Sequence, residues 1–259
     1  RATLSSRLID RPLRPLFRDG YRCETHVVAT VLSVDEEHPY DVLALNAASA
    51  ALMVSPIPFL GPVGAVLMAY ADGAWIPMAT YSQMETAVFS MVVAGKRNEQ
   101  GGIDIAMVEA GATENGLRLV AAGQPAVDEA AVARGLEEAK ESIARFIDLQ
   151  LELRAAVGEI PVVDFPVTLD YREELLTRVI DAATPRLAEV VRITSKKERK
   201  AAEDEARAAT LGELGIAEDH EDFVLATSAF KTATKRAMRR RVIEEGIRLD
   251  GRGATDVRP

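Results

Sequence analysis

The chain has 259 residues, of which 48% are hydrophobic and 27% are charged, values that are ordinary for a globular protein with one or two cores. Its single cysteine, Cys23, excludes a disulfide within the chain and fits a reducing compartment such as the cytoplasm. No apolar run reaches the roughly 18 residues that a membrane span needs, so we expect no membrane segment and a cytoplasmic location.

The charge of the chain is unevenly distributed. A net charge of −9 argues at first against a nucleic-acid partner. However, residues 1–22 hold six arginines against two aspartates, and residues 231–259 hold nine lysines or arginines against four acidic residues. Charges more than about 8–10 Å apart are screened at cellular salt. Two basic regions on an acidic body could therefore still bind phosphates locally.

Strand and helix patterns alternate over residues 1–158. The apolar, β-branched segment 25–34 is typical of a strand covered on both faces. Asp72-Gly73 is typical of a hairpin turn, and Asp41 is the expected N-cap of an alanine-rich helix. The expected strands are 25–34, 63–70, 74–76, 88–94 and 103–109, and the expected helices are 41–54 and 128–153. This pattern predicts an α/β or α+β domain.

The chain changes character after residue 158. Two prolines predict an extended linker over residues 159–168. We find no strand pattern in 169–245, and Thr184-Pro185 is expected to begin a new helix with proline at its first position. A last long helix is expected over 223–245. The second region is therefore predicted to be a small all-helical domain.

The string RLIDRPLRPLF, which begins at Arg7, places three arginines around two prolines. Guanidinium groups bind phosphate oxygens through paired charged hydrogen bonds and stay charged at any biological pH. Each proline stiffens the backbone that carries them. We therefore predict that Arg7, Arg11 and Arg14 contact RNA or phosphate, with Arg7 and Arg11 one helical turn apart.

Two further expectations concern the helix end and the ion pairs of this string. Pro12 is expected to end the helix, which would leave Arg14 in extended chain, and Asp10 is expected to orient Arg7 or Arg14 through an ion pair. The alternative is a helix end with ordinary solvated arginines.

The later run Arg239-Arg240-Arg241 is interpreted as the solvated C-terminus of a helix rather than as an RNA contact.

No self-contained catalytic set is visible in the sequence. The histidines at positions 26, 38 and 220 lack metal-ligand spacing, and the nucleophile and zinc-protease motifs are absent. The acidic cluster 35–37 reads as a solvated turn. Gly61-Pro62-Val63-Gly64 is not the loop of a KH domain, because a strand follows it, and its glycines indicate a close approach to a neighbouring element. We predict no catalytic or metal-binding residue in this chain.

Several strings together resemble one family. The closing string IRLDGRGATDVRP (residues 247–259) resembles the opening of a ribonuclease PH-type core, and RLIDRPLRPLF resembles the matching region of the first such core in polynucleotide phosphorylases. Further strings keep the order of that family. They are DVLALNAASAA from Asp41, GPVG from Gly61, VVAG from Val92 and MVEA from Met107.

The resemblance implies an α+β fold, with a ribonuclease PH-type β-α-β core whose mixed sheet packs against helices, followed by a small all-α domain. It implies a first core over 1–158 that lacks its N-terminal part, the linker 159–168, the helical domain 169–245 and the start of a second core over 246–259. The chain is thus expected to be a segment of a longer protein, with the catalytic groups in the second core.

The resemblance also implies an activity. Polynucleotide phosphorylases remove nucleotides from RNA 3′ ends in RNA processing and mRNA degradation, with inorganic phosphate as co-substrate, Mg²⁺ as cofactor and nucleoside diphosphates as products, and the reaction is reversible. They are homotrimers that bind single-stranded RNA and join RNA-degradation complexes. This segment is expected to supply RNA-guiding arginines and trimer scaffold. The alternatives are a non-catalytic RNA-binding or scaffold module of the same fold and an unrelated α/β metabolic enzyme.

Overall fold

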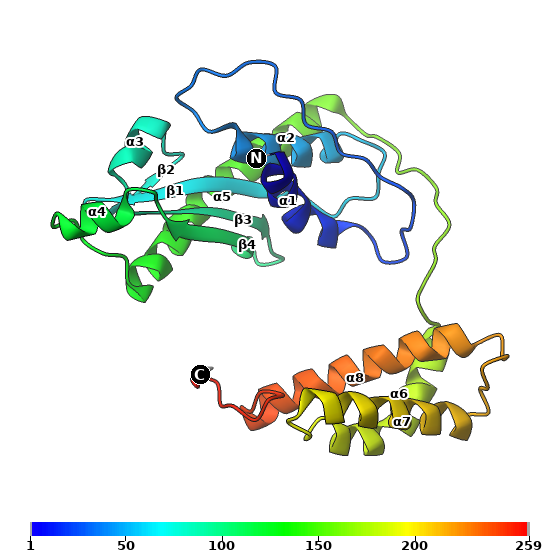
Figure 1. Ribbon diagram of the computed structural model, residues 1–259. Coiled ribbons are helices and arrows are strands. Elements are labelled where there is room, and N and C mark those ends of the chain that lie inside the picture. Colours follow the sequence, from blue (N-terminus) through cyan, green and yellow to red (C-terminus); the bar gives the residue numbers. More distant parts are fainter. Residues whose placement is uncertain (1, 258–259) are drawn as a thin grey trace. The chain divides into compact units, whose positions relative to one another are not determined.

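The computed structural model describes residues 2–257 (Figure 1). The chain divides into two compact units, Arg1–Val167 and Thr168–Pro259, and the boundary lies inside the predicted linker. The helices are α1 (Ala2–Leu13), α2 (Tyr40–Met53), α3 (Tyr81–Thr86), α4 (Gly116–Ala121), α5 (Glu129–Val157), α6 (Glu173–Val190), α7 (Lys196–Glu213) and α8 (Phe223–Glu245). The strands are β1 (Gly64–Ala71), β2 (Ala74–Pro77), β3 (Phe89–Arg97) and β4 (Ile103–Ala112), and a 3₁₀ turn, η1, covers Arg14–Leu16.

The first unit is built on a four-stranded sheet in the order β2-β1-β3-β4. The hairpin between β1 and β2 turns at Asp72 and Gly73, whose φ angles of 51° and 82° suit the tight turn predicted from this pair. The α+β class is confirmed. All pairings of this sheet are antiparallel, so among the described residues it is not the mixed sheet that the resemblance implies.

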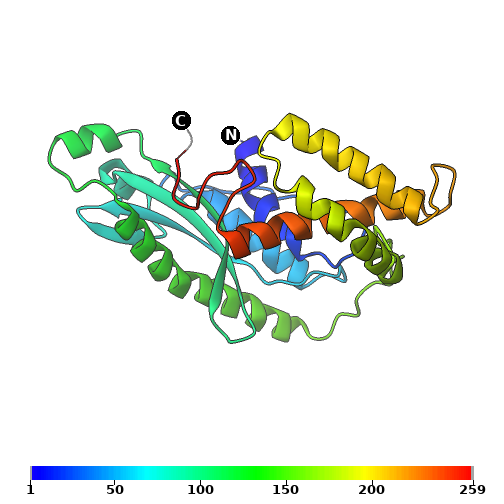
Figure 2. The ribbon, with the colours of Figure 1, turned by 90° about the horizontal axis from the view of Figure 1, so that it is seen from below.

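Helices cover both faces of the sheet. Successive side chains of a strand point to opposite faces, so neighbouring residues of β1 belong to different apolar clusters. Ala65 of β1 packs in one apolar cluster with residues of α1 and α2. Its neighbours Val66 and Met68 belong to a second cluster, which contains Ile143 and Ile147 of α5. Figure 2 shows α5 running along the sheet. The sheet and its helices therefore enclose two apolar layers.

Helix α5 packs very close to the sheet, as the glycines at the entry to β1 predicted. A Cβ atom on Gly64 would lie 2.4 Å from the carbonyl oxygen of Ile143. A Cβ atom on Gly135 would lie 2.4 Å from the indole ring of Trp75. The helix begins after Asp128, whose side chain accepts a 2.7 Å hydrogen bond from the amide of Ala131. Bare backbone at two contact points thus fixes the distance between sheet and helix.

Segment 25–34 is not a strand, so the predicted strand covered on both faces is wrong for the described chain. Its residues have no regular secondary structure, and Val28 and Leu32 are 84% and 92% exposed. A strand forms only where a neighbouring strand accepts its backbone hydrogen bonds, and no described segment pairs with this one. The composition of the segment fits a strand, but composition alone does not supply a partner.

The second unit consists of α6, α7 and α8 around a core that includes the fully buried Phe230. Helix α6 continues through Pro185, so the predicted new helix at Thr184-Pro185 is wrong. Proline removes one backbone donor, but the side chains of Thr184 and Arg186 donate to the carbonyls of Ile180 and Ala182 around this position. The apolar face of α6 is also buried on both sides of the proline, which favours one continuous helix.

One further expectation needs correction. Pro39, rather than Asp41, occupies the N-cap position of α2, and Asp41 lies in the first turn of that helix. Residues 246–257 group with the helical unit, and the start of a second core over 246–259 stays a prediction. Within the described residues, no helix is both long and apolar enough to cross a membrane.

Candidate nucleic-acid interface

Helix α1 presents the predicted arginines. Its buried residues Leu8, Pro12 and Leu13 belong to one side of the helix, and the two leucines join the apolar cluster formed with α2. This packing carries the helix one residue past the predicted boundary at Pro12. Arg14 then begins the 3₁₀ turn η1, so the expectation of extended chain at this residue is wrong.

The three arginines differ in their partners. Arg11 forms an ion pair with Glu109 of β4, where both side chains are about half exposed. Arg14 donates to Asp10 from Nε at 3.0 Å and from Nη2 at 2.6 Å, and this hydrogen bond raises the pKa of Arg14. Asp10 therefore orients Arg14, one of the two arginines expected. Arg7 is exposed and, within the described chain, forms no ion pair or hydrogen bond.

The carboxylate partners do not remove these arginines from consideration. An exposed ion pair such as Arg11–Glu109 contributes at most about 1 kcal/mol, because water and salt screen it. A phosphate oxygen could replace the carboxylate at small cost. The sequence did not reveal Glu109 as a partner, since 98 residues separate it from Arg11 and only the fold brings them together.

The first unit also contains an exposed pair of titratable groups away from the arginines. His38 and Asp35 make an exposed pair inside a turn, where hydrogen bonds from the His38 and Glu37 amides and from the His38 ring lower the pKa of Asp35. The same pair raises the pKa of His38. Across residues 2–257 no three His, Cys, Asp or Glu side chains gather at a possible metal site.

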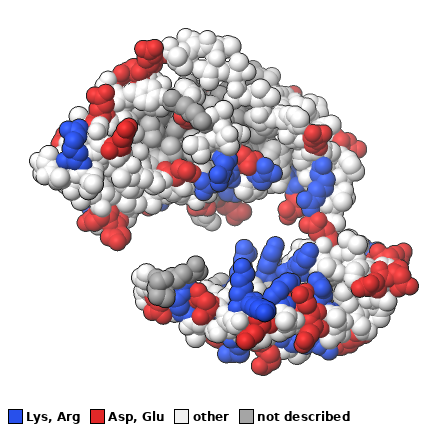
Figure 3. All heavy atoms as spheres, viewed as in Figure 1, with Lys and Arg blue, Asp and Glu red and all other residues white. Residues whose placement is uncertain are grey.

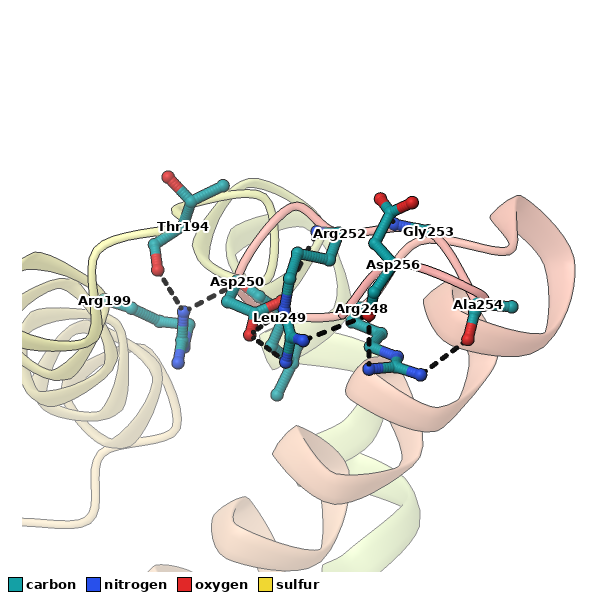
Figure 4. A network of polar contacts seen from close by, with 9 residues as sticks. All are labelled: Thr194, Arg199, Arg248, Leu249, Asp250, Arg252, Gly253, Ala254 and Asp256. Atoms are coloured by element: carbon teal, nitrogen blue, oxygen red, sulfur yellow. Dashed lines mark hydrogen bonds and ion pairs between the residues drawn. The ribbon is translucent and has the colours of Figure 1, made fainter. Parts of the chain in front are cut away.

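Three arginines of the helical unit bind its C-terminal segment, residues 246–257 (Figure 4). Arg199 of α7 donates to the carbonyls of Ile193 at 2.7 Å and Leu249 at 3.0 Å. Arg248 donates to the carbonyl of Ala254 at 2.6 Å. Arg252 binds Asp250, and this hydrogen bond lowers the pKa of Asp250. These guanidinium groups thus hold the backbone of this segment in place through carbonyl oxygens and, for Arg252, through Asp250.

The run Arg239-Arg240-Arg241 on α8 is not uniform. Arg241 is buried, donates to the carbonyl of Val191 and pairs with Glu245, so it is a structural residue of the helical core. Arg239 and Arg240 are exposed. The interpretation of the whole run as a solvated helix end is therefore wrong for Arg241.

Two family models match the chain. The model of the 3′ exoribonuclease family, domain 1, matches residues 1–58, and the model of the polyribonucleotide nucleotidyltransferase RNA binding domain matches residues 174–253. The first match contains α1 and its arginines, and the second contains α8. This combination defines the class: the chain carries a 3′ exoribonuclease domain followed by a helical RNA-binding domain.

The similarity to curated relatives extends over the whole chain. Polyribonucleotide nucleotidyltransferases of Salinispora arenicola and Acidothermus cellulolyticus are 45% and 46% identical to it, each over 100% of this chain and 33% of the relative. That of Saccharopolyspora erythraea is 47% identical over 99% of this chain and 34% of the relative. The chain is thus similar along its whole length to members of the polyribonucleotide nucleotidyltransferase family, and it spans about a third of the length of these relatives.

One solved structure is a distant match. The crystal structure of rice (Oryza sativa) Rrp46 aligns with a TM-score of 0.37 and 15% identity, over 49% of this chain and 51% of that chain. A likeness at this level supports no inference about the chain.

Proposed function

We propose that this chain is a segment of a phosphorolytic 3′-to-5′ exoribonuclease that shortens single-stranded RNA and releases nucleoside diphosphates. Its similarity to polyribonucleotide nucleotidyltransferases along its entire length is the observation that carries the proposal. The matched exoribonuclease and RNA-binding domains support the same reading.

The proposed reaction exchanges one phosphate oxygen for another. An oxygen of inorganic phosphate attacks the phosphorus of the last phosphodiester, and the bond from that phosphorus to the 3′ oxygen of the preceding nucleotide breaks. The terminal nucleotide leaves as a diphosphate, and the shortened RNA keeps a 3′ hydroxyl after it takes up a proton. Positioning and charge neutralisation dominate catalysis of this kind.

We propose that the described residues bind RNA and do not carry out the chemistry. Arg7 is available for a phosphate, and Arg11 and Arg14 can exchange their exposed carboxylate partners for one. Such contacts hold the RNA backbone without reading its bases. The proposal assigns the phosphate site, the catalytic groups and the Mg²⁺ ligands to other parts of the protein.

The cellular setting is also part of the proposal. We propose a homotrimer in the cytoplasm, with roles in RNA processing and mRNA degradation and with other RNA-degradation proteins as partners. The sheet and α5 of the first unit would serve as scaffold for the trimer. Light scattering of the full-length protein tests this assembly, and a monomer would contradict it.

The decisive experiment measures ADP release from poly(A) by the full-length protein that contains this sequence. ADP should appear only when inorganic phosphate is present. Release of AMP without phosphate would show a hydrolase and overturn the proposal. The triple variant Arg7→Gln/Arg11→Gln/Arg14→Gln should raise KM for poly(A) and leave kcat nearly unchanged, since these residues bind substrate before the reaction.

A second candidate function is a non-catalytic RNA-binding module. The observation in its favour is that no three His, Cys, Asp or Glu side chains gather at a possible metal site among residues 2–257. The isolated 259-residue chain should bind RNA but release no ADP under either proposal. ADP release by the full-length protein favours the enzyme, and its absence with intact RNA binding favours the module.

A further inference from the structure

One face of helix α8 carries a row of exposed cations, visible along the helical unit in Figure 3. The row, which we call the α8 basic face, consists of five residues: Lys231, Lys235, Arg236, Arg239 and Arg240. On a helix with 3.6 residues per turn, Lys231, Lys235 and Arg239 form one row on the side away from the buried Phe230, and Arg236 and Arg240 form a second row between the first row and the buried Ala233. The five side chains therefore form one continuous surface rather than scattered charges.

The helix dipole does not explain the α8 basic face. Favourable interaction of cations with the dipole is confined to the last turn of a helix. The last turn of α8 contains no basic residue and instead ends in Glu244 and Glu245. Lys231 lies more than three turns before this end. Interaction with the helix dipole therefore does not account for the five cations of the α8 basic face.

The α8 basic face also lacks internal counter-charges. Over the described chain, none of its five residues forms an ion pair or hydrogen bond. Other cations of the same unit do pair with carboxylates: Arg172, Arg186, Arg192, Lys200 and Arg207. Helix α8 itself has no acidic residue between Phe223 and Ile243. Repulsion along this face disfavours the folded unit, and a bound polyanion would relieve it.

We infer that the α8 basic face is a binding surface for the phosphate backbone of single-stranded RNA, an inference that rests on the proposed function and locates RNA binding within the helical unit. From Lys231 to Arg240 the face is about 14 Å long at 1.5 Å per residue. That length corresponds to about four phosphates of a stacked strand at about 3.4 Å each. The face contains no aromatic residue on which bases could stack, so binding is independent of sequence.

The test compares two double variants of the 259-residue chain that remove the same charge. Lys235→Gln/Arg239→Gln alters two neighbours on the α8 basic face, whereas Lys196→Gln/Lys197→Gln alters two exposed lysines of α7 that also lack ion-pair partners. Binding of fluorescein-labelled oligo(A) and oligo(U) is measured by fluorescence anisotropy over a series of salt concentrations. Circular dichroism confirms that both variants are folded.

The α8 variant should bind both RNAs roughly tenfold more weakly at low salt and should lower the slope of log K against log salt by about 1.4, at about 0.7 per lost phosphate contact. The α7 variant should change the affinity less than about twofold. An equal loss in both variants, or none in the α8 variant, would overturn the inference. So would loss of binding to anionic phospholipid vesicles in the α8 variant with RNA affinity unchanged, since this would assign the face to a membrane surface.

These outcomes are separable from the proposed function. If the full-length protein releases ADP while the α8 variant binds RNA like the wild type, the inference about α8 fails and the enzyme remains. If no ADP is released but the α8 variant loses RNA binding with the predicted salt slope, the enzyme proposal fails and the α8 basic face remains.

Discussion

Helices α1 and α8 both expose arginines, but these arginines differ in whether the protein supplies them with carboxylate partners. On α1 and the η1 turn that follows it, Arg11 and Arg14 are neutralised by Glu109 and Asp10, whereas Arg7 has no ion-pair partner within the described chain. On α8, five neighbouring cations have no partner within the described chain. If the α8 basic face binds RNA as proposed, the presence or absence of carboxylate partners is a better guide to phosphate binding than the number of basic residues.

The largest effect should come from the core that supports the α8 basic face. Phe230→Ala removes a fully buried ring opposite the cations and should lower the free energy of unfolding by about 3–5 kcal/mol. Urea denaturation followed by circular dichroism measures this loss. Phe230→Leu, which keeps most of the apolar volume, serves as the control. Equal stability of the two variants would contradict the burial of the Phe230 ring in the core of the helical unit.

The scaffold beneath α1 offers a parallel test. Gly64→Ala places a methyl group 2.4 Å from the Ile143 carbonyl oxygen and should cost about 1–3 kcal/mol. Gly111→Ala, where no atom lies within 4 Å of the added carbon, should change stability by less than about 0.5 kcal/mol. Thermal denaturation of the two variants provides the comparison. Equal melting temperatures would contradict the close contact between β1 and α5.

The two adjacent arginines of α8 sharpen the contrast between structural and binding cations. Arg241→Met leaves the Val191 carbonyl without its donor and should destabilise the chain by about 1–3 kcal/mol. Arg240→Met should leave stability within about 0.5 kcal/mol but weaken RNA binding. Urea titration and RNA anisotropy on both variants separate the two roles. A destabilised Arg240→Met would show that the exposed residue also supports the fold.

The smallest effect should come from an attempt to make α1 resemble α8. Asp10→Asn/Glu109→Gln removes both carboxylate partners and frees the arginines at positions 14 and 11. RNA affinity should rise by a few fold at low salt, and the gain should disappear at high salt because it is electrostatic. Anisotropy at two salt concentrations checks this. An unchanged affinity at low salt would exclude these arginines from RNA contact.

Local features of the fold were predictable from sequence. The hairpin at Asp72-Gly73 and the helix over 223–245 were predicted correctly, because turn chemistry and helical periodicity depend on neighbouring residues. The prediction of a new helix at Thr184-Pro185 was wrong because a helix tolerates proline when its packed face is buried on both sides. The strand expected over 25–34 was wrong because strand formation requires a partner, which no local pattern reveals.

The candidate sites show the same limit. The sequence singled out Arg7, Arg11 and Arg14 correctly as a group on or beside one helix, but it could not show that Glu109 would meet Arg11. It also drew attention to Arg239–Arg241 and missed the continuation of the row to Lys231. The available signal was the absence of any acidic residue between Phe223 and Ile243. If the proposal for α8 holds, a run of cations without neighbouring carboxylates is a better sequence signal for a phosphate-binding surface than three adjacent arginines such as Arg239–Arg241.

The uncovered segment 25–34 has a consequence for the colloidal behaviour of the purified chain. Residues 27–34 are rich in valine and contain no charge, proline or glycine, which is the composition of amyloid-forming strands. Glu24 on one side and Asp35, Glu36 and Glu37 on the other place negative charge at both ends, where such residues oppose stacking of chains. Self-association should therefore increase when Glu24, Asp35, Glu36 and Glu37 are replaced by the corresponding amides, which remove this charge.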